Sequence, residues 1–128
     1  MRELPSNIDI HTKESRIALT KMVMRLFDLW DISIADQGAL LNRSPTTICR
    51  YRNGECFADV KDMHDRVSNL LSIHKSLKIL YPYSEDIVYR WTSAKNMEFD
   101  SKAPIAVMKQ GLDGIISVRD HHEIRLCI

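Results

Sequence analysis

The chain has 128 residues and a formal net charge of +1, enough for one compact domain or two small ones. Its balanced acids and bases exclude a broadly basic nucleic-acid coat, so any contact with DNA must come from a local patch. It has three cysteines, no secretory signal at its start and no apolar run long enough to span a bilayer. We therefore expect a cytoplasmic protein with no membrane partner.

The first regular element is expected to be a helix that begins near Lys13, after an arm at residues 1–12 that shows no hydrophobic period. Apolar residues recur there at steps of three and four, as on one face of a helix: Ala18, Leu19, Met22, Val23, Leu26, Phe27 and Trp30. We expect this face to pack on the segment that follows.

Residues 33–54 carry the start, turn and stop signals of a helix-turn-helix. Ser33, followed three residues later by Asp36, resembles a capping box, and Ser44 precedes a proline suited to the first helical position. Asn42 tolerates the left-handed backbone that a tight turn requires, and Gly54 is a natural stop. Small Gly38 and Ala39 would allow close approach of the helices, with three apolar residues facing inward: Leu41, Ile48 and Tyr51.

The outward face of the second helix suits DNA. Hydroxyl groups reach phosphates and base edges, and an arginine can form a bidentate pair with guanine in the major groove. No acidic residue interrupts positions 39–54, so the local field attracts phosphate. The candidate DNA-binding residues are Arg43, Ser44, Thr46, Thr47, Arg50 and Arg52, with Arg50 the best single candidate. The alternative is that the two helices form a plain packing unit.

Further helices are expected downstream. A stripe at steps of four and three predicts a long helix over residues 62–81, which Pro82 ends. Ser84 caps a helix whose inward residues are Ile87, Val88 and Trp91, and Pro104 opens a short helix that Gly111 stops. Trp91 and Phe99 are expected in the core. The alternation of Ile124, Leu126 and Ile128 predicts an extended tail after a last helical turn or two.

The histidines and cysteines do not form a recognisable site in the sequence. Metal ligands at characteristic spacing are absent, and nothing beside His64 or His122 supplies a nucleophile or phosphate loop. We expect no metal, no cofactor and no catalytic residues. His74 lies within the apolar stripe and is expected to be partly buried with one hydrogen-bond partner.

The order of these features resembles the Xre/MbcA/ParS-type antitoxins over roughly residues 14–128. The features that carry the likeness are a helix ending in Trp30, the turn at 40–44, the segment 47–54, Asp65 and Arg66, residues 80–82, Trp91, residues 96–99 and 103–105, Met108 and Gly111. The resemblance implies an all-α fold, with a DNA-binding region at 1–61 packed against a helical toxin-binding domain at 62–128.

The resemblance also implies a function, that of an antitoxin in a type II toxin–antitoxin operon. The antitoxin is no enzyme; it represses its operon by binding operator DNA as a homodimer or toxin-bridged assembly, and it neutralises a RES-domain toxin that depletes NAD or ADP-ribosylates a target. Its candidate toxin-binding residues are Phe99, Met108, Arg119, Ile124, Arg125, Leu126 and Ile128. We expect the tail to obstruct the toxin's cleft; the alternative is that it packs on its own last helix.

Two other hypotheses compete with this function. One is a stand-alone helix-turn-helix repressor, in which Phe99, Met108 and the tail would be buried against the protein's own core or its dimer mate. The other is a small enzyme built around the histidines, which no catalytic pattern supports.

Overall fold

The computed structural model describes residues 11–94, 99 and 102–126, and for residues 123–126 only the helical backbone. Every regular element in the described part is helical, which confirms the all-α class. In chain order the elements are α1 (Lys13–Leu29), α2 (Ile34–Leu41), α3 (Pro45–Arg52), α4 (Lys61–Leu80), α5 (Glu85–Arg90), the 3-10 turn η1 (Trp91–Ser93), α6 (Pro104–Met108) and α7 (Leu112–Leu126). No helix in these residues is long and apolar enough to cross a lipid bilayer.

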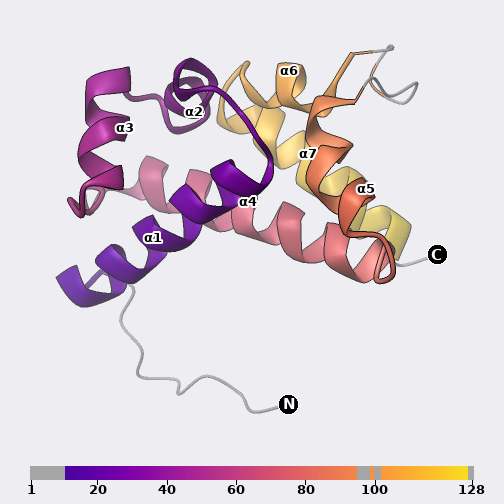
Figure 1. Cartoon of the computed structure of the whole chain (residues 1–128), viewed down its shortest axis with the longest axis horizontal. Coiled ribbons are helices and arrows are strands. Elements are labelled where there is room, and N and C mark those ends of the chain that lie inside the picture. Colours follow the sequence, from indigo (N-terminus) through magenta and orange to yellow (C-terminus); the bar gives the residue numbers. More distant parts are fainter. Residues whose placement is uncertain (1–10, 95–98, 100–101, 127–128) are drawn as a thin grey trace.

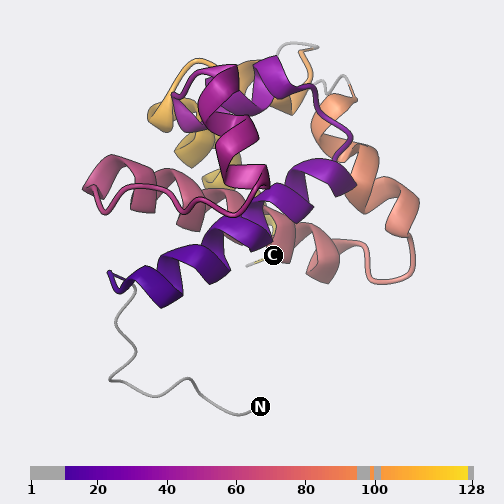
Figure 2. The ribbon, with the colours of Figure 1, turned by 60° about the vertical axis from the view of Figure 1, so that its left-hand side comes forward.

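The long helix α4 is the centre of the fold and packs against α1, α2, α5 and α7 (Figures 1 and 2). Its buried apolar residues, spaced by three and four, include Met63, Val67, Leu70, Ile73 and Leu77. They belong to a single hydrophobic cluster that also contains side chains of α1, α2 and α7. The regions 1–61 and 62–128 therefore share one core.

The buried face of α1 is rotated from the predicted one. Ala18 is exposed and Met22 is 53% exposed, whereas Met24 is only 6% exposed. Thr20 is also buried, and its hydroxyl is satisfied there: it donates to the carbonyl of Arg16 at 2.7 Å and accepts from the amide of Phe57 at 3.2 Å. The segment between α3 and α4 thus covers a polar residue of α1, a contact that a count of apolar positions could not anticipate.

Two predictions for the second half were wrong. Ile87 is exposed on α5, while Val88 and Trp91 are buried as predicted. The expected extended tail is instead the end of α7, which continues to Leu126. The buried residues of α7 include Ile115, Val118 and His122, whose steps of three and four follow the helical period. Ile128 lies outside the described residues.

Candidate nucleic-acid interface

Each helix of the α2–α3 pair begins at a serine that caps it. The hydroxyl of Ser33 accepts from the amide of Asp36 at 3.1 Å, and that of Ser44 accepts from the amide of Thr47 at 3.2 Å. The reciprocal half of the capping box is not formed, since the Asp36 carboxylate instead pairs with Lys109 at 3.1 Å. That ion pair ties the end of α6 to the start of α2.

The turn between the two helices is tight. Asn42 adopts the left-handed conformation at φ 55°, and the amide of Arg43 donates to the carbonyl of Gly38 at 2.8 Å. A Cβ atom on Gly38 would lie 2.5 Å from the carbonyl oxygen of Arg43, so only glycine fits this approach. Gly38 therefore has the predicted role, whereas Ala39 is exposed and takes no part in it.

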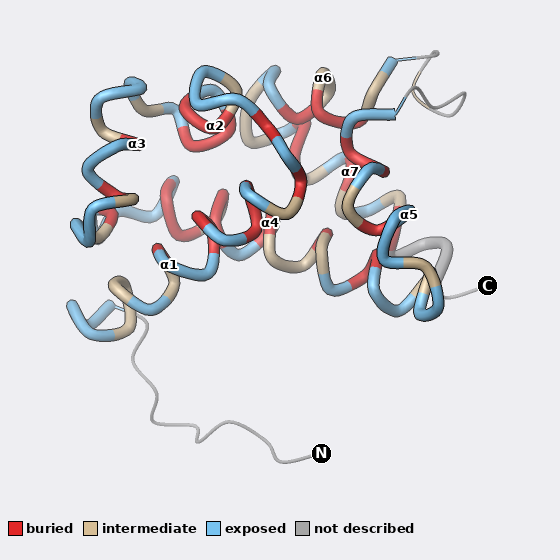
Figure 3. Tube along the Cα trace, in the orientation of Figure 1, coloured by how far each residue is buried: buried red, intermediate tan, exposed pale blue. Residues whose placement is uncertain are grey.

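Helix α3 lies at the end of the molecule's long axis opposite α5 (Figures 1 and 3). Its inward side chains, Ile48 and Tyr51, are buried in the common core, as predicted. On its other side Thr46 and Arg50 are exposed. These two residues are one helical turn apart, so their side chains lie on the same face.

The guanidinium of Arg50 has no hydrogen bond or ion pair within the described part of the chain, unlike the side chains of Arg43, Ser44 and Thr47. The hydroxyls of Ser44 and Thr47 bond to each other at 3.0 Å, and a guanidinium nitrogen of Arg43 donates to the carbonyl of Asn42 at 2.9 Å. Arg50 thus presents an unneutralised positive charge. A free guanidinium on the outer face of a short helix can reach a base edge or a phosphate.

The structure corrects the prediction for Arg52. This side chain turns inward, where its guanidinium pairs with Asp28 of α1 at 2.9 Å and donates to the side-chain oxygen of Gln37 at 2.8 Å. Gln37 is itself buried and donates to the carbonyl of Ile32 at 2.9 Å. Arg52 therefore joins α3 to α1 and α2. Asp28 lies outside positions 39–54, where the sequence has no acidic residue, and folding brings its carboxylate to Arg52.

The residues predicted to contact a toxin occupy different environments. Met108 is fully buried, which corrects its assignment to a partner surface: its side chain fills the protein's own core. Phe99 is half-buried against Trp91, with ring centroids 6.2 Å apart. Arg119 is half-buried and donates to the side-chain oxygen of Asn69 at 2.6 Å. The remaining predicted positions are Ile124, Arg125 and Leu126, on the α7 backbone, and Ile128, outside the described residues.

The sequence did not reveal an open apolar groove on α1 and α4. The groove has a volume of about 440 Å³ and is lined by Met22, Leu71, His74, Lys75, Lys78 and Ile79. Met22 and Ile79 are 53% and 55% exposed, which is unusual for large apolar side chains in one patch. Ile79 lies outside the buried stripe of α4 and could have indicated the groove, but only once the orientation of α1, which carries Met22, was known.

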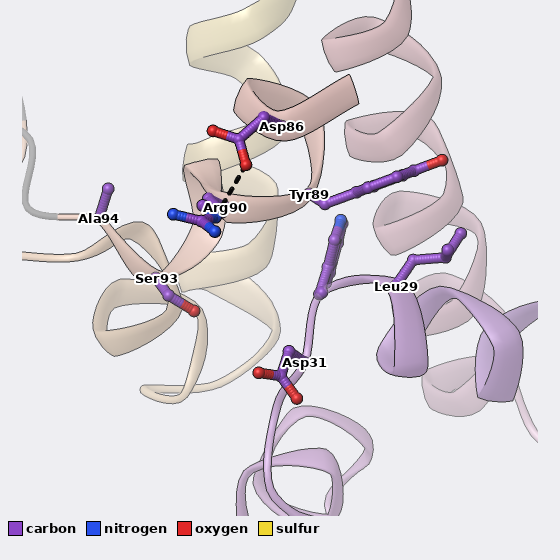
Figure 4. Close-up of a pocket in the computed structure, with 8 residues that line it drawn as sticks. Leu29, Asp31, Asp86, Tyr89, Arg90, Ser93 and Ala94 are labelled. Carbon is purple, nitrogen blue, oxygen red and sulfur yellow. Dashed lines mark ion pairs between the residues drawn. The ribbon is translucent and has the colours of Figure 1, made fainter. Parts of the chain in front are cut away.

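A second hollow lies between the end of α1 and α5 (Figure 4). Its volume is about 570 Å³, and its lining residues are Leu29, Trp30, Asp31, Asp86, Tyr89, Arg90, Ser93 and Ala94. The lining contains no histidine, lysine or cysteine, and Asp86 is paired with Arg90 at 2.9 Å.

Comparison of the sequence with protein-family models gave no match, and comparison with curated proteins gave none either.

Proposed function

We propose that this protein binds DNA through α3, with Arg50 as the principal contact to a base. The observation that carries the proposal is the unpaired, exposed guanidinium of Arg50 on the outer face of the second helix of a tightly turned helix pair. Thr46 lies one turn earlier on the same face, and the capping residue Ser44 is exposed at the start of α3; both hydroxyls can reach phosphate oxygens. Docking of α3 in the major groove would bring these side chains to the DNA together.

The test is selection of a binding site from randomised duplex DNA, followed by affinity measurements on the selected site. Arg50→Ala should lower the affinity about 5- to 150-fold, the effect of losing a contact worth about 1–3 kcal/mol. The matched control is Arg90→Ala, which removes an exposed arginine at the other end of the molecule and should leave affinity unchanged. Full affinity of Arg50→Ala, or affinity that does not fall with salt, would refute the assignment.

Recognition by one short helix covers few base pairs, so we expect two copies on the operator, as a homodimer or joined by a toxin. The two recognition helices would then lie about 34 Å apart on one face of the DNA. Light scattering of the complex on a minimal site should give two chains per duplex. A single chain on a non-repeated site would contradict this arrangement.

We further propose that the protein is the antitoxin of a RES-type toxin and that its second half holds the toxin. The observation that favours this function over a stand-alone repressor is the open groove on α1 and α4, whose apolar floor has no covering element in the described part of the chain. Lys75 and Lys78 flank it, so a partner surface with acidic residues around an apolar side chain would fit. The burial of Met108 is what a stand-alone repressor requires of that residue, so the antitoxin proposal depends on this groove rather than on Met108.

Co-expression with the protein encoded next to it tests the antitoxin function. Ile79→Glu should abolish toxin binding and protection against NAD loss while leaving DNA affinity intact, because it places a charge in the groove far along α4 from α3. Val60→Glu, a similarly exposed apolar residue ahead of α4, serves as the control. Protection by Ile79→Glu equal to that of the unchanged protein would exclude the groove as the toxin contact, and the absence of any toxin activity in the neighbouring product would exclude the antitoxin function.

A further inference from the structure

Three side chains that are scattered in the sequence converge where the segment before α1 meets the start of α4. One carboxylate oxygen of Asp59 lies 2.6 Å from Nδ1 of His11 and 2.9 Å from Nε2 of His64. The three potential ligand atoms all lie within 4.8 Å of one another. His11 and Asp59 are 48 residues apart, so no spacing rule in the sequence could have found the group.

The backbone around this group is held by contacts of Arg16 and Phe57. Arg16 of α1 donates to the carbonyl of His11 at 3.3 Å and to the carbonyl of Phe57 at 2.9 Å. Phe57 is buried and packs edge-on against the ring of His64, with centroids 5.4 Å apart. The segments that carry His11 and Asp59 are thus fastened to the same arginine.

The Asp59 carboxylate contacts the two histidines and is not paired with the neighbouring lysine. Lys61, the nearest lysine in the chain, pairs with Asp65 at 2.7 Å. Both imidazole nitrogens lie within hydrogen-bond distance of the same Asp59 oxygen. An ionised carboxylate beside two imidazoles is a donor set suited to a borderline metal ion rather than to Mg²⁺ or Ca²⁺.

We propose that His11, Asp59 and His64 bind Zn²⁺. Zinc ligands at 2.0–2.1 Å in a tetrahedral site are about 3.3 Å apart, so shifts on the order of 1 Å convert the hydrogen-bonded group into a coordinating one. The side chain of His11 is 58% exposed and its ring meets that of His64 edge-on, with centroids 4.8 Å apart, whereas the side chain of His64 is only 9% exposed, so the adjustment falls mainly on His11. Three protein ligands leave the fourth position to water.

Binding of the ion would clamp the segment before α1 onto the connection between α3 and α4. The ligands come from both sides of the helix-turn-helix in the sequence, so zinc would resist separation of α1 from α4 and stabilise the fold. The site is distinct from the Arg50 face and from the groove on α4. It can therefore be tested whether or not the protein binds DNA or a toxin.

The experiment uses the full chain, without an affinity tag, stripped of metal with a chelator and kept reduced. Calorimetric titration with Zn²⁺ should give one ion per chain, and the Tm should rise with Zn²⁺ but not with Mg²⁺. His11→Gln and Asp59→Asn should each weaken the affinity at least about tenfold, since even outer-shell partners typically contribute 10- to 100-fold. Because both side chains are substantially exposed, both variants should remain folded by circular dichroism.

His74→Gln is the matched control, because it removes another histidine from α4, ten residues after His64, and should leave zinc affinity unchanged. Substitution of Co²⁺ reports the ligand types: nitrogen and oxygen ligands give visible d–d bands without the intense thiolate charge-transfer absorption. Absence of saturable Zn²⁺ binding would overturn the proposal. So would unchanged affinity in His11→Gln, an equal loss in His74→Gln, or thiolate absorption that assigns the ion to a cysteine.

Discussion

Replacing Arg52 with alanine should lower the free energy of unfolding by about 2 kcal/mol. The larger part comes from Gln37, which is 3% exposed and whose side-chain oxygen loses its 2.8 Å hydrogen bond. An unsatisfied buried acceptor costs about 1–3 kcal/mol. The lost ion pair adds little, because the Asp28 side chain is 64% exposed and such pairs contribute about 0.2–1 kcal/mol.

Urea denaturation followed by circular dichroism measures this change. Asp28→Asn separates the two contributions, since it weakens only the exposed ion pair and should cost less than about 1 kcal/mol. Arg50→Ala is the matched arginine control, and its stability should stay within about 0.5 kcal/mol of the unchanged protein because the side chain is exposed. Equal stabilities of Arg52→Ala and Arg50→Ala would refute the structural role of Arg52, and a cost for Asp28→Asn as large as that for Arg52→Ala would refute the role of Gln37.

Two further predictions concern packing and pH. Gly114→Ala should destabilise the protein by about 1–3 kcal/mol in the same denaturation assay, because a Cβ atom there would collide with the backbone carbonyl of Val107 where α6 meets α7. The control Ala106→Gly, in the same region, should not reproduce that clash. An undiminished stability of Gly114→Ala would contradict this contact. Burial, and then the nearby charge of Lys78, lower the pKa of His74 below 6.5, so the unfolded chain binds more protons than the folded one between that lowered pKa and 6.5. The stabilisation from keeping His74 neutral is complete above pH 6.5 and is lost as the pH falls through the lowered pKa. His74→Gln should therefore lose less stability than the unchanged protein when the pH is lowered from about 7.5 to 5.5. Identical losses in the two proteins would contradict the prediction.

Within this chain, the sequence alone determined where α2, α3 and α5 begin and where the α2–α3 turn lies. The hydroxyls of Ser33, Ser44 and Ser84 cap the helices that follow them, and Asn42 takes the left-handed conformation at the turn. These features depend on residues within a few positions along the chain, so nearest-neighbour chemistry decides them. The outward direction of Arg50 follows as well, since a short helix with two buried residues has only one remaining face.

Tertiary packing decided which residues are accessible. Met22 and Met24 are equally apolar, and only the position of α1 on its neighbours exposes the first and buries the second. The sequence placed Arg52 with Arg50 among the DNA-binding candidates, whereas folding brings Asp28 and Gln37 to Arg52.

The same holds for the end of the chain and for the proposed zinc ligands. An alternation over three apolar residues is too short to distinguish a strand from the end of a helix. The segment is helical because the buried residues of α7 before it follow the helical period. His11 meets Asp59 and His64 only because α1 packs beside the start of α4. Burial and clustering depend on contacts between distant segments, and such contacts are properties of the packed helices rather than of any stretch of sequence.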